Sequence, residues 1–467
     1  MDAPPPLSET SNTWRPLLRL AWPVFAEEVL NMLVGYTDWW LAGHFLKGAE
    51  YGAAMGLMAY SMWLIPSIFS AISIGAVALI SRLVGGGQSH EARRVVGQSI
   101  LIGMVFALLG TIGVWQMAST FAAWMQLEPA AAELAVRYLY VIVPVIPLIM
   151  LEQVGIACLR GAGDTRTGLM VKVLVNVVNT VLSAGLLLGL GPLPKLGWEG
   201  LAVGTACGHG LAGLILAVIL LRGRTGLKLE LPELRPNVPL MKRLMRVGIP
   251  GGLDMLAMIA CHLIYLSIIN RLGTVPAAAH GLALRIEALA YLPGSAFQVA
   301  AATMTGQLLG AGQLQLARRS AISALLMGGS FMCGSGLLLF FGGGLIAKFF
   351  TNDASNPVSQ LAGQLLPIVA CGMPFFAIVS VFAGVLRGAG DTRWPLMINF
   401  AGLIAIRIPL AAYLAWETVP LSILGVTIIG WNLGAHGAWY AMIIDIAVRS
   451  TLIGGRFLSG RWQRVKV

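Results

Sequence analysis

Charged residues are scarce in this chain of 467 residues. Asp, Glu, Lys and Arg make up 11% of the sequence, whereas a typical soluble domain has about 25%. Hydrophobic residues make up 57%, and the mean hydropathy is +0.80. This number of charges is too small to cover the surface of a water-soluble globular protein. The composition therefore excludes a soluble globular protein and predicts an integral membrane protein.

The usual signs of an enzyme or a metal site are also missing from the sequence. The five cysteines fall inside apolar segments without ligand-like spacing. There is no zinc motif, no dinucleotide-binding fingerprint and no nucleophile–base pair with hydrolase spacing. We therefore expect a protein that is not an enzyme and has no organic cofactor.

The chain also lacks one continuous basic surface, although its formal net charge is +11. The basic residues form short clusters between apolar runs, so we expect no nucleic-acid partner. Residues 1–13 are polar and proline-rich and contain no apolar core of a signal peptide. We expect no cleavable signal peptide.

The heptapeptide RGAGDTR occurs twice, at 160–166 and 387–393, an offset of 227 residues. The same offset relates Glu27 to Asp254, and Pro23 to Pro250. The sequence is therefore a duplication, and each copy is expected to fold as a unit that packs against the other.

Two glycine-rich loops, 85–94 and 310–319, also match each other, at an offset of 225. A phosphate-binding loop is one alternative for these loops and for RGAGDTR, but none of them has P-loop spacing or follows a strand. We interpret them as tight cytoplasmic turns, in which the Asp of RGAGDTR caps the next helix.

Twelve apolar segments are long enough to cross a bilayer core of about 30 Å, which needs roughly 20 residues per helix. The predicted spans are 17–42, 52–81, 95–117, 133–158, 169–190, 199–221, 248–270, 277–308, 320–346, 359–386, 395–416 and 434–456. We expect an all-α membrane protein of twelve transmembrane helices in two pseudo-symmetric six-helix bundles.

The spans divide the chain into five predicted parts. These are a cytoplasmic tail at 1–14, an N-terminal lobe at 15–221, a basic cytoplasmic linker at 222–247, a C-terminal lobe at 248–456 and a cytoplasmic tail at 457–467. Most of the 31 Lys and Arg residues fall on one side of the membrane if both termini are cytoplasmic. We expect a multi-pass protein of the cell (inner) membrane with that orientation.

Ionisable groups in a spanning helix are costly, so each one is a candidate functional residue. In the first span, Glu27, Asn31 and Asp38 share one stripe, with the two carboxylates roughly 16 Å apart. A carboxylate near the cytoplasmic end could also simply reach toward water. The fifth and sixth spans add Asn176, Asn179 and Thr205, as cation ligands or as hydrogen bonds between helices.

The C-terminal half repeats this pattern imperfectly. Asp254 corresponds to Glu27, but Tyr265 stands where the first half has Asp38. One face of the eighth span carries His280, Glu287, Tyr291 and Gln298. The alternative for Glu287 and Asp254 is a structural ion pair with Arg285 or Arg407.

The doubled RGAGDTR, the stretch PVFAEEVLNMLVGYTDWWLAGH and the stretch AAAHGLALRIEALAYLPGSAFQVAAATMTGQLLGAG together resemble the multidrug and toxic compound extrusion (MATE) family. The resemblance covers about residues 15–460. It implies two six-helix bundles that form a V around a central cavity, and export of amphiphilic, mostly cationic compounds in exchange for H⁺ or Na⁺.

By this resemblance, Asp38 falls on the family's helix 1 aspartate, and Asn176 and Thr205 fall on polar positions of an ion site in the N-terminal lobe. Met258 and Phe376 replace acidic residues of the C-terminal lobe in some members, and Thr180 stands where some members have a second aspartate. The resemblance therefore favours ion coupling in the N-terminal lobe.

We hypothesise that Asp38 is the coupling carboxylate, with Glu27, Asn176, Asn179 and Thr205 around it and Na⁺ at Asp38 and Asn176 if sodium is the ion. The cavity that takes the substrate would be lined by Asp38, Glu287, Tyr265, Tyr291, Gln298, Asp254, Met258 and His280. The expected partners are small organic cations and the lipid bilayer, and the expected state is a monomer. The alternative function is a flippase for a lipid or lipid-linked oligosaccharide.

Overall fold

The computed structural model describes residues 13–125, 127–351, 356–421 and 426–465. Residues 1–12 and 466–467 of the two predicted tails lie outside this range. The described residues form twelve helical rods, some of them bent or interrupted. The rods are α1 (Trp14–Phe45), α2 (Ala49–Ile68) with α3 (Ser70–Gly85), α4 (Ser89–Trp124), α5 (Pro129–Ile142) with η2 (Val143–Val145) and α6 (Ile146–Gly161), α7 (Arg166–Leu188), α8 (Trp198–Arg222), α9 (Val238–Asn270), α10 (Thr274–Gly310), α11 (Leu314–Thr351), α12 (Pro357–Gly388), α13 (Arg393–Phe400) with η4 (Ala401–Arg407) and α14 (Ile408–Ala415), and α15 (Gly434–Leu458).

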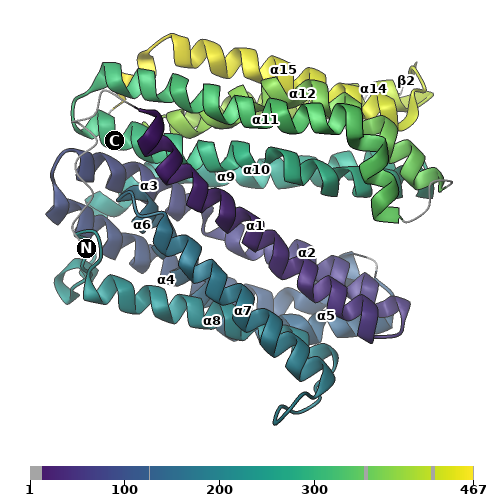
Figure 1. Cartoon of the computed structure of the whole chain (residues 1–467), viewed down its shortest axis with the longest axis horizontal. Coiled ribbons are helices and arrows are strands. Elements are labelled where there is room, and N and C mark those ends of the chain that lie inside the picture. The colour runs from purple at the N-terminus through teal and green to yellow at the C-terminus, as the bar shows by residue number, and fades with distance from the viewer. Residues whose placement is uncertain (1–12, 126, 352–355, 422–425, 466–467) are drawn as a thin grey trace.

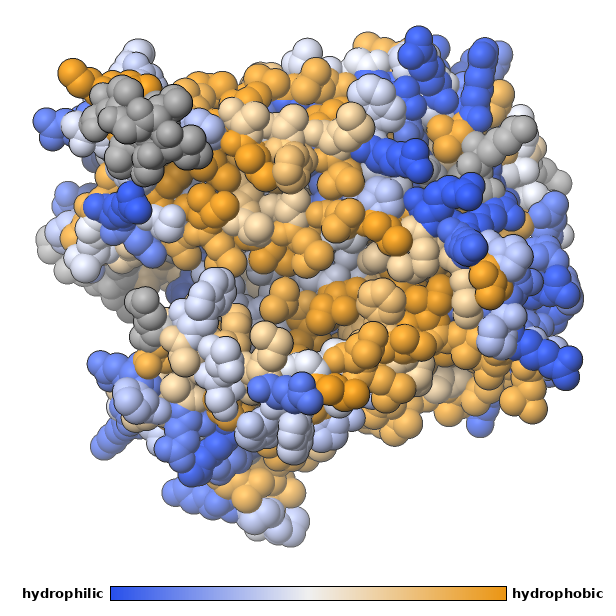
Figure 2. Space-filling model, turned by 180° about the vertical axis from the view of Figure 1, so that it is seen from behind, coloured by the Kyte–Doolittle hydropathy of each residue, from blue (hydrophilic) through white to orange (hydrophobic). Residues whose placement is uncertain are grey.

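The twelve rods agree in number and order with the twelve predicted spans, and most ends agree within a few residues, although α4 and α9 extend further. Among the described residues, eight helices are long and apolar enough to cross a membrane, or nine if the bent pair α2 and α3 is one span. The remaining rods, α1, α10 and α15, carry the polar residues described below. Figure 2 shows a broad apolar band between more polar ends, as expected of a protein that crosses a bilayer.

The rods are grouped in two lobes, one from each half of the chain (Figure 1). Each lobe has its own apolar core. The lobes meet where α3 packs against α9 and α10, and where α1 packs against α10. The first turns of α1 belong to the core of the C-terminal lobe, because Leu17, Leu20 and Ala21 are buried there. Thus α1 contributes to both lobes.

The repeated sequence motifs form tight turns, as expected. Gly163 and Gly390, at equivalent places in the two copies of RGAGDTR, have φ of 92° and 83°, which favours glycine. Asp164 Oδ1 accepts a hydrogen bond from the backbone N of Thr167 at 3.1 Å. Asp164 therefore supports the start of α7 from the position before the N-cap Thr165, close to the expected role. In the second copy, Asp391 instead pairs with Arg456.

The segment between the lobes is more ordered than a plain loop. It contains the short helix η3 (Leu231–Leu234), and α9 begins at Val238, ten residues before the predicted span. The early start has a local cause, since the side chain of Asn237 accepts a hydrogen bond from the backbone N of Leu240. Gln98 of α4 donates to the carbonyls of Glu233 and Arg235, which fastens this segment to the N-terminal lobe.

Two further local features depart from a regular helical bundle. A two-stranded antiparallel hairpin, β1 (Thr418–Leu421) and β2 (Val426–Ile429), connects α14 to α15. The π-helix η4 interrupts the eleventh rod and ends at Arg407. Short π-helical segments occur frequently at functional sites.

Candidate functional site

Asp38 lies in a buried polar cluster inside the N-terminal lobe. Thr205 Oγ1 donates a hydrogen bond of 2.7 Å to Asp38 Oδ2. Asn179 Nδ2 lies 3.3 Å from Asp38 Oδ1, and the Tyr138 hydroxyl lies 3.5 Å from Asp38 Oδ2. Only 4% of Asp38 is exposed. The cluster is completed by Ser183, whose Oγ accepts from Asn179 Nδ2 at 3.2 Å.

Four helices bring these side chains together. Asp38 comes from α1, Tyr138 from α5 and Thr205 from α8. Asn179 and Ser183 are four residues apart on α7, so they share one face of that helix. A Cβ atom on Gly204 would lie 2.6 Å from the backbone N of Ser183. The glycine therefore permits the close approach of α7 and α8 that places Thr205 beside Asn179.

The cluster has a carboxylate but no basic group. In the described part of the chain, no Lys, Arg or His nitrogen lies within 4.0 Å of Asp38. The Asn179 Oδ1 atom is buried and has no hydrogen-bond partner there. Uncompensated oxygen atoms of carboxylate, amide and hydroxyl groups suit a proton or a hard monovalent cation. The described residues contain no group of three or more His, Cys, Asp or Glu that could hold a metal ion.

The structure does not bring Glu27 or Asn176 to Asp38, in contrast to the sequence hypothesis. Glu27 Oε2 lies 2.8 Å from Arg160 Nη2. Asn176 Nδ2 donates to the backbone carbonyls of Leu30 and Lys172. The reason is that α1 contacts different neighbours along its length, so a shared stripe does not mean a shared site.

Thr180 is exposed on α7 and lies outside the cluster, whereas Ser183, one turn from Asn179, belongs to it. Tyr138 and Ser183 were missed by the sequence reasoning. No sequence pattern identifies them, because their contacts with Asp38 and Asn179 depend on how four separate helices pack.

A second buried polar cluster lies in the same lobe. Glu152 Oε1 is 2.5 Å from Lys172 Nζ, and Glu152 Oε2 is 2.7 Å from His209 Nδ1. Glu152 is fully buried. His209 is one turn from Thr205, but it faces Glu152 instead of Asp38. Here each charge has a partner, which distinguishes this cluster from the one around Asp38.

In the C-terminal lobe, Asp254 is paired, but with neither of the arginines considered from the sequence. Arg387 Nη2 lies 2.6 Å from Asp254 Oδ2, and Asn399 Nδ2 donates to Asp254 Oδ1 at 2.9 Å. The offset of 227 relates this pair to Glu27 and Arg160. The first arginine of each RGAGDTR therefore holds the carboxylate at the same position of its own lobe.

The other C-terminal residues predicted for the cavity are spread over several contacts. Trp439 Nε1 donates to His280 Nδ1 at 3.2 Å, and the Tyr265 and His280 rings lie 5.6 Å apart. Glu287 is buried, and its Oε2 atom has no hydrogen-bond partner among the described residues. The ring of Tyr291 lies against that of Phe376, and Gln298 accepts a hydrogen bond from Ser380. Met258 is 37% exposed.

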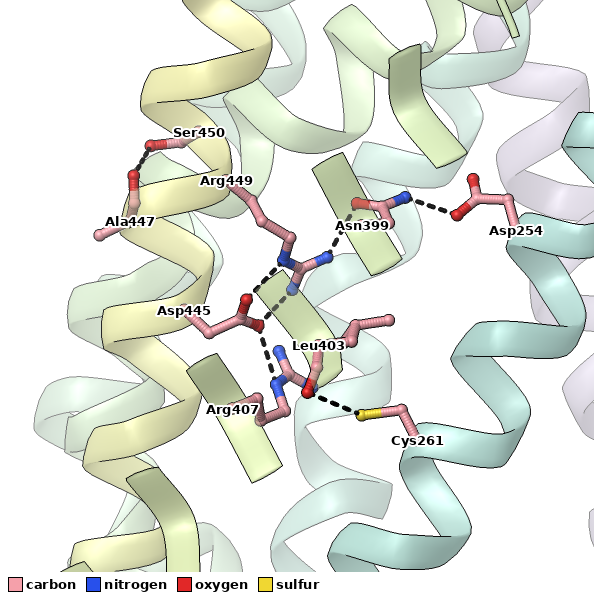
Figure 3. Close-up of polar contacts among 9 residues, drawn as sticks. All are labelled: Asp254, Cys261, Asn399, Leu403, Arg407, Asp445, Ala447, Arg449 and Ser450. Carbon is pink, nitrogen blue, oxygen red and sulfur yellow. Dashed lines mark hydrogen bonds and ion pairs between the residues drawn. The ribbon is translucent and has the colours of Figure 1, made fainter. Parts of the chain in front are cut away.

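Asp445 is the centre of a charge network that spans α15, η4 and α13 (Figure 3). Arg449 donates to both carboxylate oxygens of Asp445, at 2.9 and 2.8 Å. Arg407 Nε donates to Asp445 Oδ2 at 2.9 Å. Arg449 also reaches Asn399, which connects this network to Asp254. Asp445 and Arg449, four residues apart on α15, therefore form an ion pair within one helix.

Arg285 also has a contact that the sequence did not predict. Its guanidinium lies over the ring of Trp39, 5.0 Å from the ring centre. Trp39 belongs to α1, next to Asp38, so this cation–π contact joins the two lobes close to the candidate site.

Comparison with known proteins places the chain among transporters. The family model MatE matches residues 23–184 and 250–413, one match in each half. The chain is 28% identical to the probable multidrug resistance protein NorM of Thermotoga maritima over 463 residues, which covers 98% of this chain and 95% of that protein.

Two solved structures have the same fold. One is described as the outward-facing conformation of a multidrug resistance MATE family transporter of the MOP superfamily, with a TM-score of 0.85, 20% identity and coverage of 97% and 96% of the two chains. The other is a MATE in the bent conformation, with a TM-score of 0.84, 21% identity and coverage of 96% and 94%.

Proposed function

Because the chain belongs to the multidrug and toxic compound extrusion family, as the match of its family model to both halves shows, we propose that it exports amphiphilic, mostly cationic organic compounds in exchange for H⁺ or Na⁺. It acts as a secondary antiporter by alternating access, with Asp38 as the coupling carboxylate. This role requires no cofactor besides the coupling ion and no enzymatic step.

The observation that carries the proposal is the isolation of Asp38. Glu27 and Glu152, which are also buried carboxylates of this lobe, both have basic partners within 3 Å. Among the described residues, the polar contacts of Asp38 come only from hydroxyl and amide groups. A buried carboxylate without a countercharge favours a bound proton or cation, and either one can leave when water reaches the site from the other side.

The neighbours of Asp38 explain how the site could hold either ion. Thr205 and Asn179 donate hydrogen bonds to the ionised carboxylate, and the Tyr138 hydroxyl donates to Thr205 Oγ1 beside it. If Na⁺ is the ion, the oxygens of Asp38, Asn179 and Thr205 supply ligands, and Asn179 Oδ1 has no hydrogen-bond partner among the described residues. If H⁺ is the ion, the protonated carboxyl still accepts hydrogen bonds from its neighbours and also donates one through its own O–H.

The exported substrate would leave through the space between the lobes on the side away from the repeated turns. There the surface is hollowed between the two halves (Figure 2). The cytoplasmic side would be the opposite end, where hydrogen bonds from Thr303 to the carbonyl of Arg160 and from Gln307 to that of Gly161 tie the lobes together. We place both termini on the cytoplasmic side of the cell (inner) membrane and expect a monomer.

The test uses proteoliposomes and a rhodamine methyl ester, a permanently cationic amphiphile, with Na⁺ and H⁺ gradients imposed separately. We expect wild-type protein to export the dye with one or both gradients, and Asp38→Asn to reduce gradient-driven export to that of empty vesicles. Full ion-driven export by Asp38→Asn would show that another group couples the ion. Flipping of a fluorescent lipid without dye export would support the flippase instead.

A matched pair of threonine variants tests the boundaries of the site. Thr205→Ala removes a hydroxyl that donates to Asp38, so we expect it to weaken the ion dependence by about tenfold. Thr180→Ala removes a hydroxyl from the exposed face of α7, one residue from Asn179, and should leave the ion dependence unchanged. Equal effects of the two changes would contradict the site as drawn.

A further inference from the structure

The segment that follows α15, residues 459–465, is anchored to the C-terminal lobe by a tryptophan. It contains the short 3-10 helix η5 (Arg461–Arg464), which follows a turn at Gly460 with φ of 65°. Trp462 is fully buried. Its ring stacks on that of Phe457 with ring centres 5.5 Å apart, and its Nε1 donates to the carbonyl of Phe457 at 2.9 Å. These contacts fix this C-terminal segment on its own lobe.

Beyond the anchor, the C-terminal segment contacts the other lobe. Arg82 of α3, in the N-terminal lobe, donates a hydrogen bond of 2.7 Å from Nη1 to the backbone carbonyl of Val465. In the described part of the chain, the Arg82 side chain has this one hydrogen bond and no ion pair. A partly buried guanidinium needs an acceptor, and Arg243, which lies within electrostatic range, brings only a like charge. The Val465 carbonyl therefore supplies what the side chain of Arg82 requires.

The internal repeat shows that this contact is one of a pair. The offset of 225 that relates the two glycine-rich loops also relates Arg82 to Gln307. Gln307, on α10 of the C-terminal lobe, donates to the carbonyl of Gly161 in the N-terminal lobe at 3.1 Å. Each of the two equivalent residues therefore donates a hydrogen bond to a backbone carbonyl of the opposite lobe. The repeat would relate Gly161 to Gly388, but Arg82 instead bonds to the segment after the last helix.

The two lobes touch at the place where these bonds join them. A Cβ atom on Gly85 of α3 would collide with the carbonyl of Gln307, and one on Gly310 of α10 would collide with the carbonyl of Arg82. The two helices therefore meet backbone to backbone at the end of the molecule that we place on the cytoplasmic side. When the lobes separate at this end, the bond from Arg82 to Val465 must break, because the segment stays on the C-terminal lobe.

We propose that the C-terminal segment is a latch that stabilises the state in which the lobes are closed on the cytoplasmic side. Trp462 holds the latch on one lobe, and Arg82 binds its free end from the other lobe. The bond forms only in the closed state, so it shifts the balance between the closed and open states without touching substrate or ion. This inference rests on the alternating access proposed above and adds a segment that sets the balance between its two states.

The test measures the distance between the lobes at this end by double electron–electron resonance. Spin labels are attached at Ser89 of α4 and Gln315 of α11, two exposed positions on opposite lobes, in the intact chain with its five cysteines replaced by alanine. The H⁺ and Na⁺ concentrations are set so that the protein populates a short and a long distance. Arg82→Gln should lower the ratio of short to long distances by about tenfold. Truncation after Gln463 keeps Trp462 and removes the acceptor, so it should give the same shift.

Further variants separate a latch from two unrelated effects. If Arg82 and the C-terminal segment act through one bond, Arg82→Gln combined with the truncation should shift the ratio no further than either change alone. Trp462→Ala keeps the length of the chain but loosens the anchor, so it should also lower the ratio. Replacement of Arg464 and Lys466 by Gln in the intact chain controls for the charges that the truncation removes, and it should leave the ratio within about twofold.

The outcomes distinguish the latch from the efflux function. If both distances occur but Arg82→Gln and the truncated chain keep the wild-type ratio, the latch is wrong and the efflux function stands. Additive shifts for these two changes would also overturn the latch, because Arg82 and the segment would then act separately. If wild-type protein has a single distance under every ion condition, alternating access fails and the latch fails with it.

Discussion

The two lobes share their framework and differ in their charged interiors. In both, the first arginine of RGAGDTR holds a carboxylate at the same position, Glu27 with Arg160 and Asp254 with Arg387. Beyond that pair the lobes diverge. In the described part of the chain, the N-terminal lobe leaves the carboxylate of Asp38 without a basic partner, while the C-terminal lobe has Tyr265 at the equivalent position.

This difference separates what folds a lobe from what it does. Duplication preserved the contacts that every copy needs, namely the turns and the ion pair beside them. At the position where the N-terminal copy has Asp38 and the C-terminal copy has Tyr265, one lobe has a buried charge and the other does not. Such a charge is costly in a membrane interior, so a buried charge without a partner is a candidate for a functional role.

The largest expected effect is on the free energy of unfolding, and it compares a variant of Arg449 with a variant of Asp38. Arg449→Gln removes two hydrogen bonds to Asp445 and one to Asn399 and leaves the buried Asp445 with the single contact from Arg407 Nε, so it should lower the free energy of unfolding by about 3 kcal/mol. Asp38→Asn keeps the size of the side chain and removes an unpaired buried charge, so it should change that free energy by less than about 1 kcal/mol. Unfolding in mixed micelles measures both values. A loss for Asp38→Asn as large as that for Arg449→Gln would assign Asp38 a structural role.

Two equivalent glycines give the next largest difference. A Cβ atom on Gly388 would lie 2.6 Å from the backbone of Ala302, whereas one on Gly161 would lie 3.1 Å from the Cβ of Ile80. A side chain can move away from a new Cβ atom, whereas a helix backbone can move only together with the helices packed against it. Gly388→Ala should therefore cost about 3 kcal/mol and Gly161→Ala about 1 kcal/mol, measured in the same unfolding assay. Equal losses would mean that the packing around Gly388 is no tighter than the packing around Gly161.

The ion pair that both lobes share predicts equal losses of stability in the two lobes. Arg160→Gln and Arg387→Gln each leave a buried carboxylate without its base, although both arginines are partly exposed. Each change should lower the free energy of unfolding by about 2 kcal/mol, and the two values should agree within about 0.5 kcal/mol. A large loss in one lobe alone would show that only one of the two pairs supports the fold.

The sequence predicted the fold well because the relevant signals are local. Spans follow from runs of apolar residues, turns from glycines that need positive φ, and the two lobes from the doubled RGAGDTR. It also identified Asp38 with Asn179 and Thr205, because polar residues are rare in the spans.

The remaining site residues could not be predicted, because partners in a helical bundle are set by the way the helices pack. Tyr138 and Ser183 have no distinguishing pattern, and Glu27 shares a stripe with Asp38 but not a site. One signal was available and was not used. The repeat that relates Glu27 to Asp254 also relates Arg160 to Arg387, which would have indicated the two ion pairs.

The smallest expected effect has opposite signs in the two lobes. The Tyr138 hydroxyl donates to Thr205 Oγ1 at 3.1 Å, whereas the Tyr265 hydroxyl is buried without a partner in the described part of the chain. Tyr138→Phe should therefore lower the free energy of unfolding by about 1 kcal/mol, and Tyr265→Phe should leave it unchanged or raise it by up to about 1 kcal/mol. Because both changes remove only one oxygen atom, each controls for the other. If Tyr265→Phe also lowers stability, its hydroxyl has a partner and the polar interiors of the two lobes are more alike than we infer.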